Sequence, residues 1–199
     1  MVPLMSRLMP GATGMIRADH SRLLVVLHRY RGTESPAARQ APVRAGARLL
    51  EIHAALEEEI FYPACRAAGI DNPVLDKSLN EHAEMHRLIE ELRAADPASA
   101  AFDQGVMALM RVVLHHMADE ETVLLPDAER VLGPDRLAEL GLQMTRRRLQ
   151  LAAPQAGEIA ADTLRNARPA SVLMAAGVLL AGGYMVKRAF GHNGASARR

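Results

Sequence analysis

Apolar side chains recur along most of this chain at the three- and four-residue spacing of an α-helix, and no segment keeps the alternation of a β-strand. A first helix is predicted over about residues 13–31, where Ile16, Leu23 and Leu27 fall near one face. Three further helices are predicted over about residues 43–68, 73–96 and 98–132. Four such helices predict an all-α fold, an up-down four-helix bundle.

The pattern changes beyond the Gly133-Pro134 break. Residues 135–153 predict an additional helix with Leu137, Leu140 and Met144 on one side. The chain therefore divides into an irregular lead-in (1–12), the bundle (13–133), the additional helix (134–153), a linker (154–169), an apolar helix (170–188) and a basic tail (189–199).

The apolar run at residues 170–186 carries no charge and is followed by Lys187-Arg188. As a helix it would be about 25 Å long, slightly short of a bilayer core of about 30 Å. We interpret it as a membrane anchor. The alternative is a docking or self-association helix, since Gly177, Gly182 and Gly183 would allow close pairing in a homo-oligomer.

Composition narrows the class of protein. The chain has 199 residues, 49% of them hydrophobic, which suits one domain with appendages. A formal charge of +1 gives no case for a nucleic-acid partner. Cys65 is the single cysteine, so no disulfide forms within a chain. Residues 1–9 lack the apolar core of a secretory signal, so we expect a cytoplasmic domain, membrane-tethered at most by its C-terminal run.

A repeated pattern of metal-ligand side chains overlies this helical framework. Two His-x3-Glu-Glu segments occur, each followed by a proline at the same distance, with a His-x3-His between them and an Asp-His before both. These are His53 to Pro63, His116 to Pro126, His82-x3-His86 and Asp19-His20. Residues four apart on a helix lie roughly 40° apart, so each pair can aim two donors at one point. The pattern predicts two similar helical hairpins around a shared metal site.

These segments resemble the hemerythrin-like domain, also called the HHE cation-binding domain, from about residue 14 to about residue 132. The resemblance implies two iron ions in a carboxylate-bridged centre, with one coordination position open to dioxygen. It implies that His82, His86 and His116 bind one iron, that His20 and His53 bind the other, and that Glu57 and Glu120 bridge them.

The function expected from this resemblance is binding of dioxygen, or sensing of oxygen or redox state, with an unidentified redox partner. A di-iron oxidase, a peroxidase-like scavenger of peroxide or nitric oxide, and an iron-holding protein are the alternatives. The sequence shows no nucleophile–base set, phosphate loop or CxxC pair. We therefore favour a protein that binds metal and oxygen over a catalyst.

Some assignments remain open in the sequence. His115 could replace His116, although on a regular helix it would lie roughly 140° from Glu120 and need a π-bulge. The flanks shared with His53 favour His116. The acids Glu58, Glu59, Asp119 and Glu121 are either solvated or orient ligand histidines. Asp19 either orients a ligand histidine or simply lies near the start of a helix. Residues 146–148, three arginines, predict a solvated helix face, with a membrane-surface or phosphate contact as the alternative.

Overall fold

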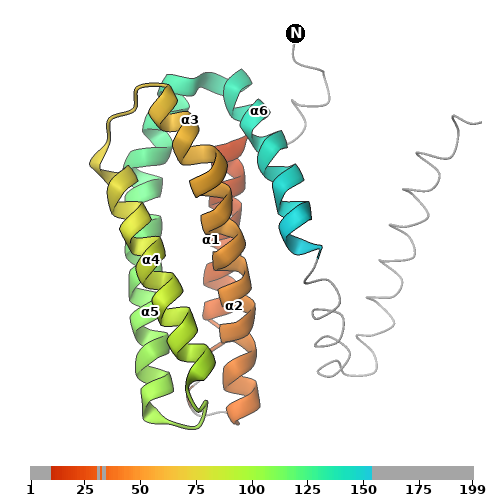
Figure 1. Cartoon of the computed structure of the whole chain (residues 1–199), viewed down its shortest axis with the longest axis vertical. Helices are drawn as coiled ribbons and strands as arrows, with labels where there is room; N and C mark the ends of the chain where they lie inside the picture. The colour runs from red at the N-terminus through yellow and green to blue at the C-terminus, as the bar shows by residue number, and fades with distance from the viewer. Residues whose placement is uncertain (1–9, 31, 33–34, 154–199) are drawn as a thin grey trace, which may run out of the picture. The chain divides into compact units, whose positions relative to one another are not determined.

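The computed structural model of this chain describes residues 10–30, 32 and 35–153. Regular structure within these residues is entirely helical, as the sequence predicts (Figure 1). The elements are α1 (Ala12–Leu27), α2 (Pro36–Leu56), η2 (Glu57–Phe61), α3 (Tyr62–Ala67), α4 (Pro73–Ala94), α5 (Ala100–Asp119), η3 (Glu120–Leu124) and α6 (Leu125–Ala152).

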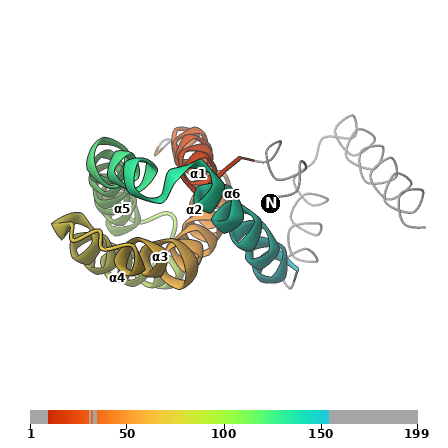
Figure 2. The same ribbon diagram turned by 90° about the horizontal axis from the view of Figure 1, so that it is seen from above.

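The elements from α1 to the start of α6 form four rods of helix. The rods lie side by side (Figures 1 and 2). The second rod continues from α2 through η2 into α3, and the fourth continues from α5 through η3 into α6. Contacts join α1 to α2 and α4 to α5, so each helical hairpin packs within itself. The described residues thus form the four-helix arrangement expected from the sequence.

Helix starts follow local capping chemistry. The side chains of Ser35, Asn72 and Ser99 each accept a hydrogen bond from a backbone N–H in the first turn of the helix that follows. At Ser35 this signal corrects the predicted start of the second helix near residue 43. The helix begins at Pro36, a favoured first residue, and continues through Pro42.

Two π-helical segments lie just before the prolines that follow the repeated His-x3-Glu-Glu pattern. The N–H of Tyr62 donates to the carbonyl of Glu57, five residues earlier, and the N–H of Leu125 does the same to Glu120. A proline follows each of these donors, at Pro63 and in the equivalent place on α6. Proline has no N–H, and its ring presses on the carbonyl four residues back, so a widened turn accommodates it without breaking the helix.

Two apolar clusters flank the histidines. On α1, Ile16 belongs to the first cluster and Leu23 to the second, with His20 between them in sequence. On α4, Leu75 and Met85 flank His82 in the same way. The fold therefore places one polar layer between two apolar layers inside the bundle.

Helix α6 turns sharply at Gly133, whose φ of 69° lies in the left-handed region that glycine tolerates best. The residues beyond it are those for which the sequence predicts an additional helix. Leu137, Leu140 and Met144 are buried there against the first apolar cluster. A Cβ atom at Gly141 would lie 2.6 Å from the carbonyl oxygen of Pro10, so this segment packs directly on the chain entering α1.

The predicted linker (154–169), apolar helix (170–188) and basic tail (189–199) lie outside the described residues, as does most of the predicted lead-in. Among the helices in the described part of the chain, none is both long enough and apolar enough to cross a bilayer.

Candidate metal centre

Six side chains from the four rods meet between the apolar clusters. Each is at most 2% exposed. They are His20 on α1, His53 on α2, Glu57 in η2, His82 on α4, His116 on α5 and Glu120 in η3. All six belong to the ligand set that the sequence predicts. Their donor atoms form two overlapping groups, each with all atoms within 4.8 Å of one another.

The donors are arranged as two triads, each with one glutamate facing two histidines. Oε2 of Glu57 lies 3.2 Å from Nε2 of His53 and 3.4 Å from Nε2 of His82. Oε2 of Glu120 lies 3.3 Å from Nε2 of His20 and 3.5 Å from Nε2 of His116. The triads adjoin, since Nε2 of His82 and Nε2 of His116 are 3.2 Å apart. The histidines thus turn the same nitrogen toward a common interior point.

The outward nitrogen of each histidine faces a carboxylate from another helix. Nδ1 of His20 lies 2.8 Å from Glu121, and Nδ1 of His82 lies 2.8 Å from Glu58. A carboxylate that accepts the Nδ1 proton leaves Nε2 free to bind a metal. Glu58 and Glu121 therefore orient histidines, which is one of the two roles open to them in the sequence.

The remaining two histidines repeat the arrangement at longer range. Nδ1 of His53 lies 3.8 Å from Asp19, and Nδ1 of His116 lies 3.5 Å from Glu81. Asp19 directly precedes His20 and faces His53 on the next helix. In the second hairpin, Glu81 directly precedes His82 and faces His116 on the next helix. This equivalence gives the centre an approximate two-fold symmetry, which the repeated sequence pattern anticipates.

Several inward atoms have no hydrogen-bond partner, including Nε2 of His20, Nε2 of His53, Oε1 of Glu57 and Oε2 of Glu120. Unpartnered polar atoms inside a protein are rare and call for an explanation. Imidazole nitrogens and carboxylate oxygens that converge without partners fit a bound transition-metal ion. The residues present therefore suit the metal centre that the sequence predicts.

The electrostatics of the pocket also favour a cation. Burial and the neighbouring Glu120 raise the pKa of Glu57 well above its usual value. Burial lowers the pKa of His116 to about 3, which keeps its imidazole neutral and able to coordinate. A positive ion between the two glutamates would stabilise both of their ionised forms.

Tyr62 is a site residue that the sequence analysis missed. Its buried hydroxyl lies 2.8 Å from Oε1 of Glu120 and 3.2 Å from Oε2 of Glu57. Its ring stacks on His82, with centroids 5.8 Å apart. In the sequence, a tyrosine on the apolar face of a helix is typical of a core residue. The one signal of a role in the site is its position directly before Pro63. The equivalent residue of the second hairpin is Leu125.

His86 is the predicted ligand that the structure does not bring to the centre. Its side chain is exposed on α4. The inward face of α4 runs from Ser78 through His82 and Met85 to Ile89, at steps of three and four residues. Met85 therefore occupies the interior one turn beyond His82, and His86 points away from it.

His115 is exposed, whereas His116 lies in both donor groups. The π-helical segment begins at Glu120, so the backbone between residues 116 and 120 keeps the ordinary α-helical spacing. The π-helical turn lies after this interval, so it does not rotate His115 toward Glu120.

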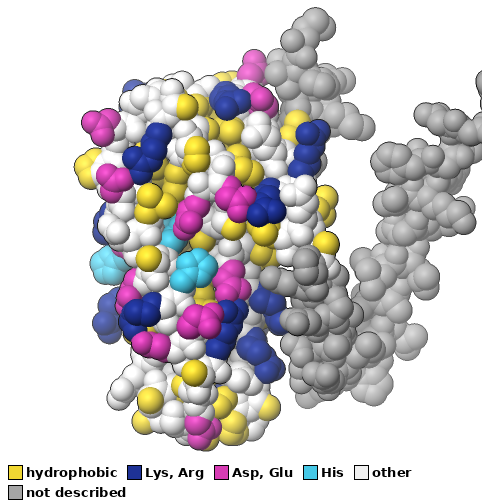
Figure 3. Space-filling model, in the orientation of Figure 1, with side chains coloured by type: hydrophobic (Ala, Val, Ile, Leu, Met, Phe, Trp, Pro, Cys, Tyr) yellow, Lys and Arg dark blue, Asp and Glu magenta, His cyan; other side chains and the backbone are white. Residues whose placement is uncertain are grey.

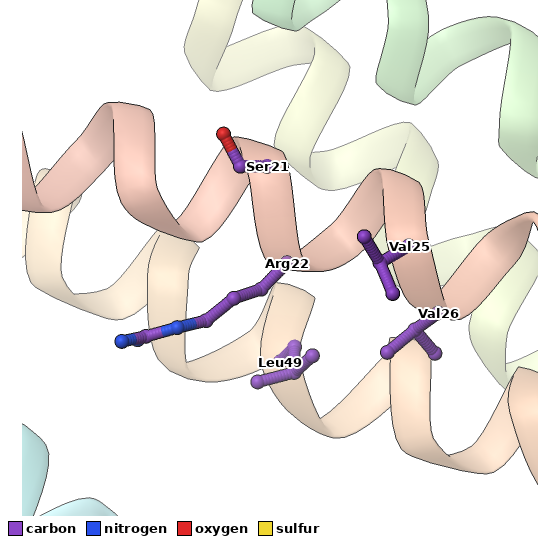
Figure 4. Close-up of a pocket in the computed structure, with 5 residues that line it drawn as sticks. All are labelled: Ser21, Arg22, Val25, Val26 and Leu49. Carbon is purple, nitrogen blue, oxygen red and sulfur yellow. The ribbon is translucent and has the colours of Figure 1, made fainter.

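An open apolar hollow of about 400 Å³ lies between α1 and α2, apart from the six donors (Figure 4). It is lined by Ser21, Arg22, Val25, Val26 and Leu49. A second hollow, of about 380 Å³ between α4 and α5, includes His115 and Glu81. Neither hollow is lined by any of the six donors, which are buried.

Comparison with known proteins gives a family match. The family model described as Hemerythrin HHE cation binding domain matches residues 12–128, a range that contains all six donors and ends before Gly133. The chain is also 28% identical over 110 residues to a protein of a Nostoc species named DNA nickase. That alignment covers 55% of this chain but 31% of the Nostoc protein, so the chain spans about a third of that relative. No solved structure matches the chain.

Proposed function

The chain belongs to the hemerythrin HHE cation-binding family, and on that premise we propose that its six buried donors hold two iron ions bridged by Glu57 and Glu120. We further propose that this centre binds dioxygen, or senses oxygen or redox state through it. The observation that carries the proposal is the pair of adjoining triads, each with two inward imidazole nitrogens and one carboxylate.

The residues around the donors supply three conditions for such a centre. Carboxylates at the outward nitrogens fix the imidazoles of His20 and His82 in the orientation that coordinates metal, and carboxylates face those of His53 and His116 at longer range. The apolar clusters exclude water from the layer of donors. The Tyr62 hydroxyl holds the two glutamate side chains beside each other. A pair of ferrous ions, when bound, supplies two electrons to dioxygen.

His86 is left out of the proposed donor set because its side chain is exposed. The set then contains four histidines, where the family resemblance implies five. Fewer protein donors leave more coordination positions for a small ligand such as dioxygen, peroxide or nitric oxide. The centre is therefore proposed to be more open than the sequence analysis expects.

DNA cleavage is not proposed for this chain. The name DNA nickase belongs to a protein of which only 31% aligns. On the face shown in Figure 3, acidic and basic side chains of the described residues are interspersed, without a broad basic patch. Such a surface provides no electrostatic track for a phosphate backbone.

The proposal is tested by the visible spectrum of the purified, iron-loaded chain, recorded after reduction and again after exposure to air. A protein that binds oxygen reversibly develops a new absorption band in air and loses it when oxygen is removed. Sustained consumption of added peroxide would instead show a scavenging enzyme. A spectrum that does not respond to reduction or air would contradict both activities and leave an iron-holding protein.

A further inference from the structure

The segment of α6 beyond Gly133 adds a contact to the metal centre from outside the matched family domain. Residues 134–152 follow the range of the family match and pack on the chain entering α1. The last turns of this segment bring two consecutive arginines against the bundle. Arg147 pairs with Glu59, at 2.6 and 2.8 Å, and Arg148 pairs with Asp19. For Arg147 and Arg148 these contacts correct the prediction of a solvated basic face, whereas Arg146 is exposed.

The Arg148–Asp19 pair uses both prongs of the guanidinium. Nη1 of Arg148 donates to Oδ1 of Asp19 at 2.7 Å, and Nη2 donates to Oδ2. The Asp19 side chain is 6% exposed and that of Arg148 is 23% exposed. A two-pronged pair of this kind fixes the plane and rotation of a carboxylate, which a single point charge does not do.

Asp19 in turn faces a proposed ligand. Its Oδ2 lies 3.8 Å from Nδ1 of His53, whose Nε2 belongs to the Glu57 triad. The contacts thus run from Arg148 through Asp19 to His53 and on to the interior of the site. Asp19 and Arg148 are 129 positions apart in the sequence, so the fold alone brings them together.

In the other hairpin, the carboxylate that faces the histidine is paired with a lysine and not with an arginine. Glu81 takes the place of Asp19 and lies 3.5 Å from Nδ1 of His116. Its cation is Lys77, whose Nζ lies 3.4 Å from Oε1 of Glu81 and also bonds Asp119. The Lys77 side chain is 49% exposed. An exposed, shared ammonium holds its carboxylate far less firmly than a guanidinium fork does.

We propose that Arg148 is a positioning residue of the metal centre, which holds Asp19 so that His53 presents Nε2 to the metal. This inference rests on the proposed function, because it requires that the centre binds iron. The segment beyond Gly133 then helps to position a proposed metal ligand. The two halves of the centre are also unequal, since the partner of His53 is held by a two-pronged arginine and the partner of His116 by an exposed lysine that it shares with Asp119.

The test is the rate at which a ferrous chelator removes iron from anaerobically loaded full-length protein. Arg148→Gln should release iron about tenfold faster than the wild type, the lower end of the usual effect of losing a partner of a metal ligand. Arg148→Lys keeps the charge but not the fork and should fall between the two. Arg147→Gln is the matched control, because it removes the neighbouring ion pair to Glu59 without touching Asp19, and should match the wild type.

A double variant separates positioning from simple docking of the helix. If Arg148 acts through Asp19, then Arg148→Gln adds nothing to the release rate of Asp19→Asn. Equal acceleration by Arg147→Gln, or a wild-type release rate in Arg148→Gln, overturns the inference while iron binding stands. A wild-type chain that takes up no iron overturns the proposed function and this inference together.

Discussion

At the scale of single residues, the centre depends on which atoms of each side chain face inward. The four buried histidines turn Nε2 to the interior and Nδ1 to a carboxylate. The two glutamates are completely buried, and each faces a pair of histidines. A buried carboxylate without a cation is costly, so its retention here points to a metal.

The glutamates should be the bridges. Glu57→Gln or Glu120→Gln preserves size but removes a negative charge from between the two ions. We expect the iron content to fall to one ion per chain or fewer. Elemental analysis checks this, with the exposed Glu59→Gln as the control from the same π-helical segment. An unchanged iron content in both buried-glutamate variants would contradict the bridging role.

The histidines divide sharply by burial, which makes a matched set of variants. His116→Ala should reduce the iron content, because it removes a donor shared by both groups. His115→Ala and His86→Ala should leave the content unchanged, because both side chains are exposed. Metal analysis of the three proteins decides the matter. Loss of iron in His86→Ala would show that α4 rotates when metal binds and would restore the fifth histidine.

At the scale of elements, helix breakers determine how the donors are presented. The π-helical turns begin at Glu57 and Glu120 and accommodate the prolines that follow. The repeated His-x3-Glu-Glu pattern with its later proline was readable in the sequence, and it places six of the seven predicted ligands together. The form of the distortion was not readable, because a proline signals either a kink or a bulge.

Other features escape the sequence for definite physical reasons. The sequence predicts the start of α2 too late because a proline such as Pro42 usually interrupts a helix. Ser35 and Pro36 nevertheless supply a start signal. The inward role of Tyr62 depends on the π-turn before it. The contact of Arg148 with Asp19 depends on the direction that α6 takes after Gly133, and no local pattern encodes it.

The docking of the segment beyond Gly133 can be tested at Gly141. Gly141→Ala places a methyl group 2.6 Å from the carbonyl oxygen of Pro10, so backbone must shift. We expect a loss of about 1–3 kcal/mol in the free energy of unfolding. Gly14→Ala is the control, since its methyl group meets only an ordinary contact at 3.5 Å and favours α1. Equal stability of the two variants in denaturant titrations would show that the segment is not tightly docked.

At the scale of the whole molecule, the six proposed donors lie between residues 20 and 120, and the arginine that contacts Asp19 from α6 is residue 148. All of them belong to the described part of the chain. A chain ended after residue 153 should therefore keep the iron content of the full-length chain. Elemental analysis of both proteins checks this, and loss of iron on truncation would mean that residues 154–199 contribute to the site. The same pair of chains, fractionated after a carbonate wash, tests the membrane anchor predicted for 170–186.

The central claim is that this chain holds two iron ions, and counting them tests it most directly. The measurement is elemental analysis of the full-length protein purified from iron-replete medium. The account predicts about two irons per chain, as in other carboxylate-bridged centres built inside helical bundles. One tightly held ion, no metal, or zinc in place of iron would contradict it.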